Sequence, residues 1–567
     1  MVPFTCLVPH APGGVAWRSR APAGCAPCPL GAAVIARRRV AVVSTLTVLV
    51  LGAGTSVAAA GVPAAEPLPS EVPALAWAGC GTTAAATAAG VECATADLPM
   101  DHDEPEGARV QIAVARVPAT DPANRIGSVF VNPGGPGGEF TTYLQRSGAG
   151  LFADLNARFD IVAFAPRGVA PSTPAVDCGF SATEGFFSQP APTPFDVDPA
   201  ALVASAQEYV DACVANNGEV LEHLSTANVA RDMDALRAAV GDDRLTYLGF
   251  SYGTFLGATY AALFPDRYRA LVLDGAVDPV EYLTDPVSSS TAQAAAFERA
   301  LDRFAEACAV DQPACSGFGG PDPLLAYDRL LATAEAAPIP APGYPEDPRP
   351  VTADEIRGVT LTLLYAKRLW GLLAAALAAA EAGDASGVRA LADQLLYADP
   401  ASNDRFVAIS ASEQQWPTDV DAYLERGAAE WAAFPHFWGS YAYSELPWGL
   451  WPVQDEDAYY GSYEVPETSP APLVIGTTYD PATPYAGSVA MVEAQGNARL
   501  LTMEGDGHTA YGGNSACIDS VTDAYLFDQA LPAAGTVCQQ EVSVVAPADV
   551  PVEASTATQR LAIPLAG

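Results

Sequence analysis

Lysine is almost absent from this chain of 567 residues, which contains a single one, Lys367, beside Arg368 in a helical and apolar context. This scarcity excludes a GxxxxGK phosphate-binding loop and argues against catalysis through a lysine Schiff base. Positive charge is scarce as a whole, since 28 Lys and Arg face 66 Asp and Glu, for a formal net charge of -38. A nucleic-acid partner is therefore not expected, because binding to phosphate backbones requires clustered positive charge. The acidity favours solubility and is compatible with substrates that carry a free amino group.

Long apolar runs are also lacking, and the run 40–51 is shorter than the roughly 20 residues that cross a membrane. It follows three arginines at 37–39, and the small residues at 58–60 follow it. The first 60 residues contain no acidic side chain. This pattern is typical of an export signal. We therefore predict a leader over 1–60, a Pro- and Ala-rich linker over 61–76, and a secreted mature chain without a membrane span.

No CxxC motif remains after the predicted leader, and the histidines are scattered, so neither a metal nor a cofactor is expected. Eight cysteines remain, and they fall into couples along the chain. An even number in an exported protein predicts disulfides, although the sequence alone permits other connectivities. The predicted couples are Cys80 with Cys93, Cys178 with Cys213, Cys308 with Cys315, and Cys517 with Cys538.

The stretch 245–263, LTYLGFSYGTFLGATYAAL, joins an apolar strand-like run directly to a helical pattern at the sequence GFSYG. Gly249 and Gly253 lie two positions on either side of Ser251, where a sharp turn needs very small residues. GxSxG by itself arises by chance in a glycine-rich chain. Its position between a strand and a helix favours a nucleophile elbow, with helix amides available for developing negative charge.

Strand-like segments alternate with a helical one around this elbow. Strands are expected near 110–115, 128–131, 159–165 and 270–274, and a helix over 226–240, with an excursion over 170–225. This alternation predicts a parallel sheet with helices on both faces. The strand 128–131 ends in NPGGPGG (132–138), which is either an ordinary tight loop or a turn that presents backbone amide donors.

The segment 281–467 has a different character, because it is Ala-rich and carries six of the eight tryptophans. Helices are expected within it over 291–309, 356–382 and 422–434. We interpret it as a helical cap inserted after the strand that ends at Asp274, the alternative being an independent second domain. Sheet character resumes at 472–476 and 499–503. The predicted core therefore consists of 77–280 and 468–540, and a tail covers 541–567.

A serine nucleophile needs a base to accept its proton and a carboxylate to orient that base. Asp480 follows the strand 473–476 and His508 follows the strand 499–503, each in the kind of loop where parallel sheets place their functional residues. The order Ser251, Asp480, His508 is that of α/β-hydrolases.

Other residues compete for these roles. Asp274 also follows a sheet strand and is the main rival acid, whereas Asp506 is too close to His508 in sequence to orient it. His102 and His223 are expected at the surface. His436, within FPHFWG of the cap, is expected near the substrate pocket.

Taken together, the motifs VNPGGPGG, PRG, STANVARDMDALRAAVG, the elbow region, YDPATPY and GDGHTAY resemble the secreted tripeptidyl aminopeptidase-like branch of the α/β-hydrolases, which are relatives of prolyl aminopeptidases. The resemblance covers about 77–538. It implies Ser251 as nucleophile, Asp480 as acid and His508 as base, with an oxyanion hole from the amides of Tyr252 and Gly135. Members often carry a further cysteine pair near AISASEQQW and ELPWGLWP, where this chain has none, so the resemblance says less about substrate preference.

The expected activity is that of a secreted serine exopeptidase, which releases short units, tripeptides, from free N-termini through an acyl-enzyme. An esterase or amidase of small molecules and a catalytically silent binding protein are the alternatives. A buried substrate ammonium would need a carboxylate partner, for which Glu139, Glu413 and Glu445 are candidates beside the plain surface interpretation of each. The sequence leaves the oligomeric state and the number of residues released undetermined.

Overall fold

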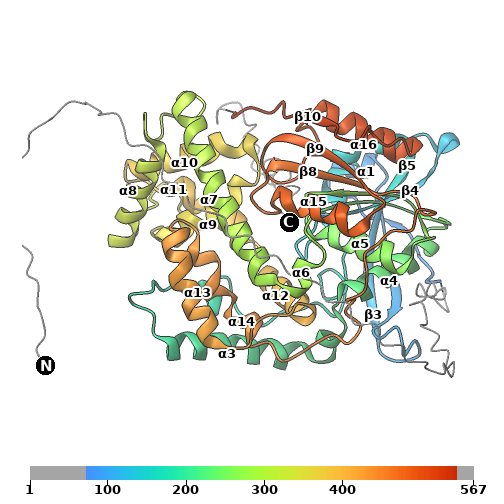
Figure 1. Ribbon diagram of the computed structural model, residues 1–567, viewed down its shortest axis with the longest axis horizontal. Coiled ribbons are helices and arrows are strands. Elements are labelled where there is room, and N and C mark those ends of the chain that lie inside the picture. Colours follow the sequence, from blue (N-terminus) through green and yellow to red (C-terminus); the bar gives the residue numbers. More distant parts are fainter. Residues whose placement is uncertain (1–71, 546–567) are drawn as a thin grey trace, which may run out of the picture. The chain divides into compact units, whose positions relative to one another are not determined.

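The computed structural model describes residues 72–545, so the predicted leader (1–60) and parts of the linker (61–71) and tail (546–567) lie outside the described residues. The described chain forms a ten-stranded sheet in the order β1-β2-β3-β5-β4-β6-β7-β8-β9-β10 (Figure 1). β1, β2, β3 and β5 pair antiparallel, and the remaining pairs are parallel. The strands are β1 Ala78–Gly79, β2 Glu92–Pro99, β3 Arg109–Val117, β4 Gly127–Asn132, β5 Phe159–Phe164, β6 Leu245–Phe250, β7 Tyr268–Asp274, β8 Leu473–Tyr479, β9 Arg499–Asp506 and β10 Val537–Gln539.

Helices cover both faces of this sheet, as alternate strand residues demonstrate. In β4, Phe130 belongs to a hydrophobic cluster with residues of α4 and α5, whereas Val129 and Val131 belong to another cluster with residues of α2 and α16. Every residue of β4 and β6 is buried, as expected for central parallel strands covered on both faces. The helices of the core are α1 Ala84–Ala88, α2 Thr141–Ser147, α3 Pro199–Asn217, α4 Thr226–Ala239, α5 Tyr252–Leu263, α15 Tyr485–Gln495 and α16 Ala516–Asp528.

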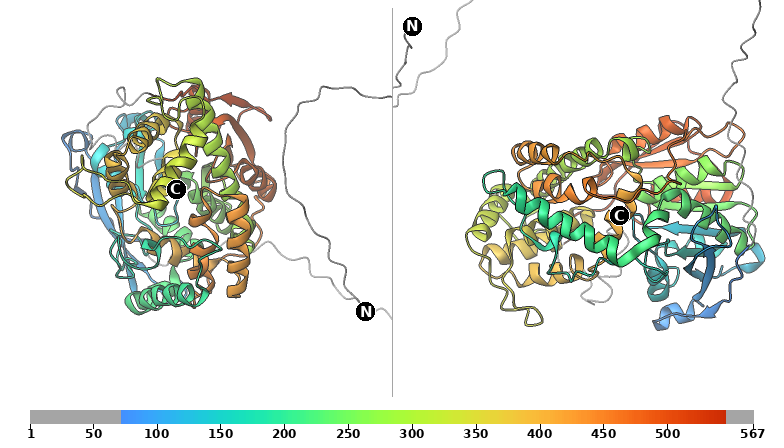
Figure 2. Two further views of the ribbon diagram at one scale, coloured as in Figure 1. Left: turned by 90° about the vertical axis from the view of Figure 1, so that its left-hand side faces the viewer. Right: turned by 90° about the horizontal axis from the view of Figure 1, so that it is seen from below.

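The chain between β7 and β8 is mainly helical. Helices α7 to α11 pack around a hydrophobic cluster of their own, whereas residues of α12 and α14 join the cluster that covers α4 and α5. The insertion and the sheet accordingly belong to one compact unit, and Figures 1 and 2 show the inserted helices gathered beside the sheet. The inserted helices are α6 Glu281–Thr284, α7 Pro286–Val310, α8 Pro323–Ala336, α9 Ala353–Leu364, α10 Trp370–Glu381, α11 Ser386–Leu395, α12 Ser402–Glu413, α13 Val420–Ala433 and α14 Leu446–Gly449.

Two helical segments differ from the sequence-based expectation. The helix expected over 356–382 is two helices, α9 and α10, because the chain between them turns to place Tyr365 and Lys367 against the loop of His508. The excursion over 170–225 contains the 19-residue helix α3, which was not predicted. Its start is marked by Asp198, whose side chain caps it, and by a proline in the first turn, and both features are readable from the sequence.

The structure joins all four predicted cysteine couples: Cys80–Cys93, Cys178–Cys213, Cys308–Cys315 and Cys517–Cys538. The last of these links α16 to β10, the strand that pairs with β9 immediately before His508. Among residues 72–545, no helix has both the length and the apolar character that a membrane crossing requires.

We expect the protein without its predicted leader to contain no free thiol, since each of the eight cysteines beyond residue 60 is paired. Thiol titration of the mature protein under denaturing, non-reducing conditions measures this directly. Two or more reactive thiols per chain would be incompatible with the four disulfides, and peptide mapping would identify the pair that is open.

Candidate active site

Ser251 lies at the sharp turn where β6 ends and α5 begins. Its φ of 56° is in the left-handed region, which a non-glycine residue adopts only when the surroundings impose it. A Cβ atom at Gly249 would lie 2.4 Å from the carbonyl oxygen of Gly253, and one at Gly253 would lie 2.8 Å from Asn132 Oδ1. Both positions therefore require glycine, and the GxSxG sequence forms the strained turn that exposes a nucleophilic hydroxyl.

The glycine loop after β4 packs directly against this turn. Gly134 has a φ of +103°, and a Cβ atom there would lie 2.8 Å from Ser251 Cβ. The amide of Gly134 donates to Asn132 Oδ1 at 2.9 Å, which fixes the loop. Within the described residues, the amides of Gly135 and Tyr252 donate to no protein acceptor, although both residues line the same cavity as Ser251. These two N–H groups can therefore receive an oxyanion.

His508 is bound to the carboxylate of Asp480. Its Nδ1 lies 2.9 Å from Asp480 Oδ1 and 3.0 Å from Oδ2. Asp480 is fully buried, and it also accepts the amides of Ala482 and Thr483, both at 2.9 Å. A carboxylate so satisfied is an acceptor, so we assign the Nδ1–H tautomer to His508, which leaves Nε2 free to accept a proton.

Nε2 of His508 is buried and has no hydrogen-bond partner among the described residues, so it is not bonded to Ser251 Oγ in this structure. Catalytic hydrogen bonds of this kind commonly tighten only in the substrate complex. The arrangement provides what a serine hydrolase needs: a hydroxyl at a strained turn, an imidazole held by a buried carboxylate, and two free amides.

Asp274, the rival acid, has a different place. Its carboxylate accepts the amides of Ala510 at 3.0 Å and Tyr511 at 2.8 Å, and its backbone carbonyl accepts the amide of Ser251 at 2.9 Å. Complete burial raises the pKa of Asp274 to about 7. Asp274 therefore connects the turn of Ser251 to the loop of His508 through backbone amides, and the acid bonded to the imidazole is Asp480.

The inserted helices support the loop of His508. The amide of His508 donates to the carbonyl of Tyr365 at 2.7 Å, and the two rings pack nearly perpendicular to each other at a centroid distance of 5.3 Å. Two residues earlier, Asp506 forms ion pairs with Lys367, at 2.7 Å, and with Arg303. Burial alone would raise the pKa of Asp506, but these two cations lower it. The single lysine of the chain thus binds the insertion to this loop.

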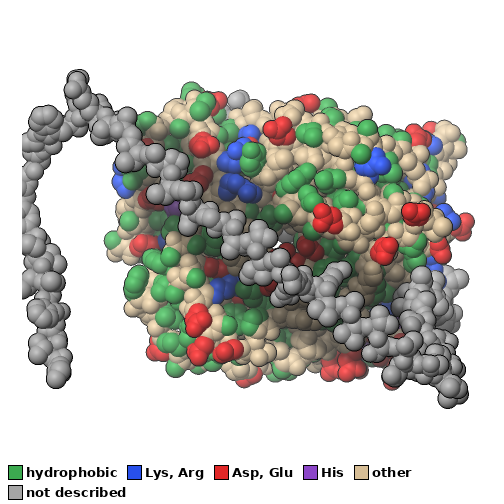
Figure 3. All heavy atoms as spheres, in the orientation of Figure 1, with side chains coloured by type: hydrophobic (Ala, Val, Ile, Leu, Met, Phe, Trp, Pro, Cys, Tyr) green, Lys and Arg blue, Asp and Glu red, His purple; other side chains and the backbone are tan. Residues whose placement is uncertain are grey.

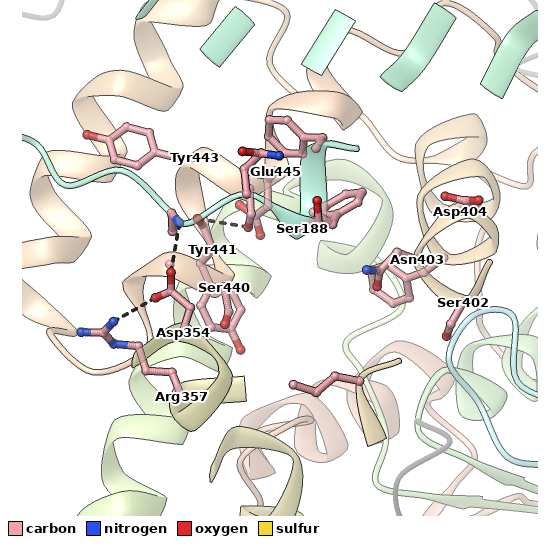
Figure 4. A pocket seen from close by; sticks show the side chains of 18 of the residues that line it. Ser188, Asp354, Arg357, Ser402, Asn403, Asp404, Ser440, Tyr441, Tyr443 and Glu445 are labelled. Carbon is pink, nitrogen blue, oxygen red and sulfur yellow. Dashed lines mark hydrogen bonds and ion pairs between the residues drawn. The ribbon is translucent and has the colours of Figure 1, made fainter. Parts of the chain in front are cut away.

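A cavity of about 1310 Å³ opens above Ser251. Residues of the core, of the inserted helices and of the segment 180–205 line it, and several are aromatic. In the view of Figure 4, Asp354, Tyr441 and Glu445 lie on one side and Asn403 of α12 on the other. Acidic side chains are spread over the molecular face drawn in Figure 3.

Comparisons with known proteins bear on the family of this chain. The chain matches the family described as alpha/beta hydrolase fold over residues 127–314, and the family described as TAP-like protein over residues 435–538. It is 34% identical to serine protease Hip1 of Mycobacterium tuberculosis, over 79% of this chain and 87% of the relative. The chain belongs to the α/β-hydrolase family.

Two further relatives of this α/β-hydrolase carry different activities in their names. It is 30% identical to a tripeptidyl aminopeptidase of Streptomyces coelicolor, over 79% of this chain and 83% of the relative. It is 33% identical to carboxylesterase B of Mycobacterium tuberculosis, over 79% of this chain and 86% of the relative. The relatives named as proteases, together with the family, identify this chain as a peptidase-like serine hydrolase.

Two expectations for the other histidines of this α/β-hydrolase are wrong. His436 does not line the cavity, because its ring is held at 2.6 Å from Glu298 and 2.9 Å from Asp328 within the inserted helices. His102 is not a surface residue, since only 16% of its side chain is exposed and its Nε2 lies 3.0 Å from the buried Asp232.

His223 is half-buried, and its ring nitrogen lies within 4.8 Å of carboxylate oxygens of Asp101 and Asp457. Together, these three side chains offer ligand atoms that could hold an ion. None of the three lines the cavity, and the chemistry at Ser251 does not use them.

Two of the three carboxylates predicted to bind substrate in this α/β-hydrolase are placed elsewhere. Glu139 accepts the amide of Thr142 at 3.0 Å and the hydroxyl of Thr141, so it caps the start of α2 and does not line the cavity. Glu413 is buried against Thr226 and does not line the cavity either. Sequence adjacency to the glycine loop misled the interpretation of Glu139, because an acid at a helix start satisfies free amides.

Glu445 does line the cavity. Its carboxylate is bonded to Arg426 and to the hydroxyl of Ser290, and burial raises its pKa. Sequence reasoning missed Asp354 and Asp399, which also line the cavity and lie on the inserted chain. Nothing in their local sequence marks them, because they reach the cavity only through the packing of helices far apart in the chain.

Proposed function

We propose that this serine hydrolase is a secreted exopeptidase that releases short peptides, tripeptides, from free N-termini. The proposal rests on one arrangement: Ser251, the free amides of Tyr252 and Gly135, and the buried Asp480–His508 pair lie at a cavity of about 1310 Å³ covered by inserted helices. That volume slightly exceeds the upper end of usual small-ligand pockets, about 1,000 Å³, so it suits a short peptide.

In the proposed reaction, Ser251 Oγ attacks the scissile carbonyl while His508 Nε2 accepts its proton. The amides of Tyr252 and Gly135 stabilise the resulting oxyanion. His508 then gives the proton to the departing amine, which leaves an ester between Ser251 and the released segment. Water, deprotonated by His508, hydrolyses this ester, and Asp480 holds the imidazole in one tautomer throughout. These steps use only side chains and amides of this chain.

Two relatives named as a serine protease and a tripeptidyl aminopeptidase support a peptide substrate. The relative named carboxylesterase B favours the alternative, an esterase or amidase of small molecules, since one triad serves both reactions. A catalytically silent binding protein is the third possibility. The four disulfides support export, because such bonds persist in oxidising compartments.

An exopeptidase must recognise the substrate's protonated amino terminus. An ammonium that is withdrawn from water without a partner would cost several kcal/mol. Glu445, on the cavity wall, keeps its predicted role in this proposal, and Asp354 and Asp399 are further acids on the same cavity. Arg426 already pairs with Glu445, so a substrate ammonium there would share the carboxylate with it.

Acetylation of the substrate's amino group should therefore lower kcat/KM about 100-fold or more, because it removes the charge that these carboxylates meet. The measurement uses chromogenic mono-, di- and tripeptide amides with free and acetylated N-termini, with simple esters alongside. Tripeptide amides with free N-termini are expected to be cleaved best. Equal cleavage of free and acetylated tripeptide amides would refute the exopeptidase proposal and favour the esterase or amidase.

A further inference from the structure

The phenol of Tyr252, the residue after Ser251, is joined to the inserted helices by a chain of side chains. The hydroxyls of Tyr252 and Thr226 are hydrogen-bonded. Thr226, at the first position of α4, donates its hydroxyl to Glu413 Oε1 at 2.7 Å and its amide to Glu413 Oε2 at 2.8 Å. All three residues are buried, with an exposed fraction of 5% for Tyr252 and 1% each for Thr226 and Glu413.

The hydrogen bonds that join Tyr252, Thr226 and Glu413 can form in either protonation state of Glu413. When Glu413 is ionised, the single hydroxyl proton of Thr226 goes to the carboxylate and Tyr252 donates to Thr226. When Glu413 is protonated, its carboxyl proton is donated to the Thr226 hydroxyl, which then donates to the Tyr252 hydroxyl. Burial raises the pKa of Glu413 to about 8, and these hydrogen bonds can form whether or not the carboxyl is protonated.

A second carboxylate of the inserted chain fixes the same helix start. Asp455 accepts the amide of Ser225 at 2.6 Å and lies 3.2 Å from the side-chain amide of Asn228, and its own amide donates to the carbonyl of Ser412. The start of α4 is thereby held by the inserted chain, since free amides at a helix N-terminus require acceptors. Thr226 is then an anchored point from which its hydroxyl holds Tyr252.

Tyr252 is also the residue whose amide points toward the oxyanion in the proposed mechanism. Its ring packs against Phe255 and Tyr282, each at a centroid distance of 6.1 Å, and its hydroxyl end is held by Thr226. A side chain held at both its ring and its hydroxyl resists rotation of the residue. The direction of the N–H is thus fixed on a turn that is strained at Ser251.

We propose that Thr226 and Glu413 are positioning residues, which hold Tyr252 so that its amide faces the developing oxyanion. The inference rests on the proposed roles of Ser251 and Tyr252. Thr226 and Glu413 do not line the cavity, so they act on the reaction only through Tyr252. A role in orientation predicts a change in kcat, whereas a role in substrate binding predicts a change in KM.

The test compares Thr226→Val and Tyr252→Phe, each alone and together, with Thr226→Ser as the variant that keeps the hydroxyl. Thr522→Val is the matched control, because Thr522 is fully buried on α16 and its hydroxyl has no partner in the described chain. Each single variant should lower kcat about 10-fold with KM within about twofold, less than the loss of a whole oxyanion donor. The kcat of the double variant should also fall about 10-fold, because both changes break the same series of hydrogen bonds.

Thr226→Ser and Thr522→Val should keep at least half of the parental kcat. A fall of about 100-fold in the double variant, an unchanged kcat in both single variants, or a rise in KM alone would overturn the proposal. If Thr226→Val does not fold, Tyr252→Phe alone carries the test. The assay uses a tripeptide nitroanilide or, if the parental enzyme cleaves only esters, a nitrophenyl ester, so failure of the exopeptidase proposal is seen separately in the parental protein.

Discussion

Ser251→Ala should lower kcat by ~10⁴-fold or more and leave the fold intact. The Ser251 hydroxyl forms no side-chain hydrogen bond within the described residues, and its place at the turn depends on the backbone and on Gly249 and Gly253. The residual rate would come from binding and from the free amides of Tyr252 and Gly135. The measurement is steady-state hydrolysis of the best substrate, with thermal unfolding as the control for folding. Near-parental turnover would remove Ser251 from the mechanism.

Asp480→Asn should lower kcat by ~10⁴-fold, since an amide in this position favours the wrong imidazole tautomer. Asp274→Asn is the matched comparison, because both carboxylates are fully buried and both accept backbone amides of loops at the site. Its effect should be milder, since the amide oxygen of asparagine can still accept from the Ala510 or Tyr511 backbone. Both variants are assayed for kcat and for unfolding temperature. A larger loss for Asp274→Asn would identify Asp274 as the orienting acid.

The strands and the turn of Ser251 could be predicted because they depend on local sequence. β6 and β7 are short and mostly apolar runs, and Gly249 and Gly253 are both positions where a Cβ atom would collide with backbone or a neighbouring side chain. The post-strand positions of Asp480 and His508 followed from the rule that functional loops lie at the carboxyl ends of parallel strands. The choice between Asp480 and Asp274 required the structure, since both residues follow a strand.

The positions of the carboxylates that were expected to bind substrate could not be predicted from local sequence. Glu139 is next to the glycine loop in sequence, but its carboxylate accepts the amide of Thr142 at the start of α2. Glu413 is at the end of α12 and meets Thr226, 187 residues away in the chain. Contacts of this range depend on how the inserted helices dock, and no periodicity or motif encodes that docking.

The break between α9 and α10 has the same origin. Both segments have helical sequence patterns and α10 is Ala-rich, so the sequence predicts one continuous helix. In the structure, the carbonyl of Tyr365 accepts the amide of His508, and Lys367 forms an ion pair with Asp506. Tertiary contacts to the loop of His508 thus override a strong local preference for helix.

If Ser251 is a nucleophile activated by His508 and Asp480, it should react covalently with an activated phosphonate. The mature protein is treated with a fluorophosphonate, and the adduct is located by intact mass and peptide mapping, with Ser251→Ala as the control. One adduct per chain is expected, on the peptide that contains Ser251, and none on the variant. An adduct on another residue, or no adduct on a folded parental protein, would show that Ser251 is not the activated nucleophile.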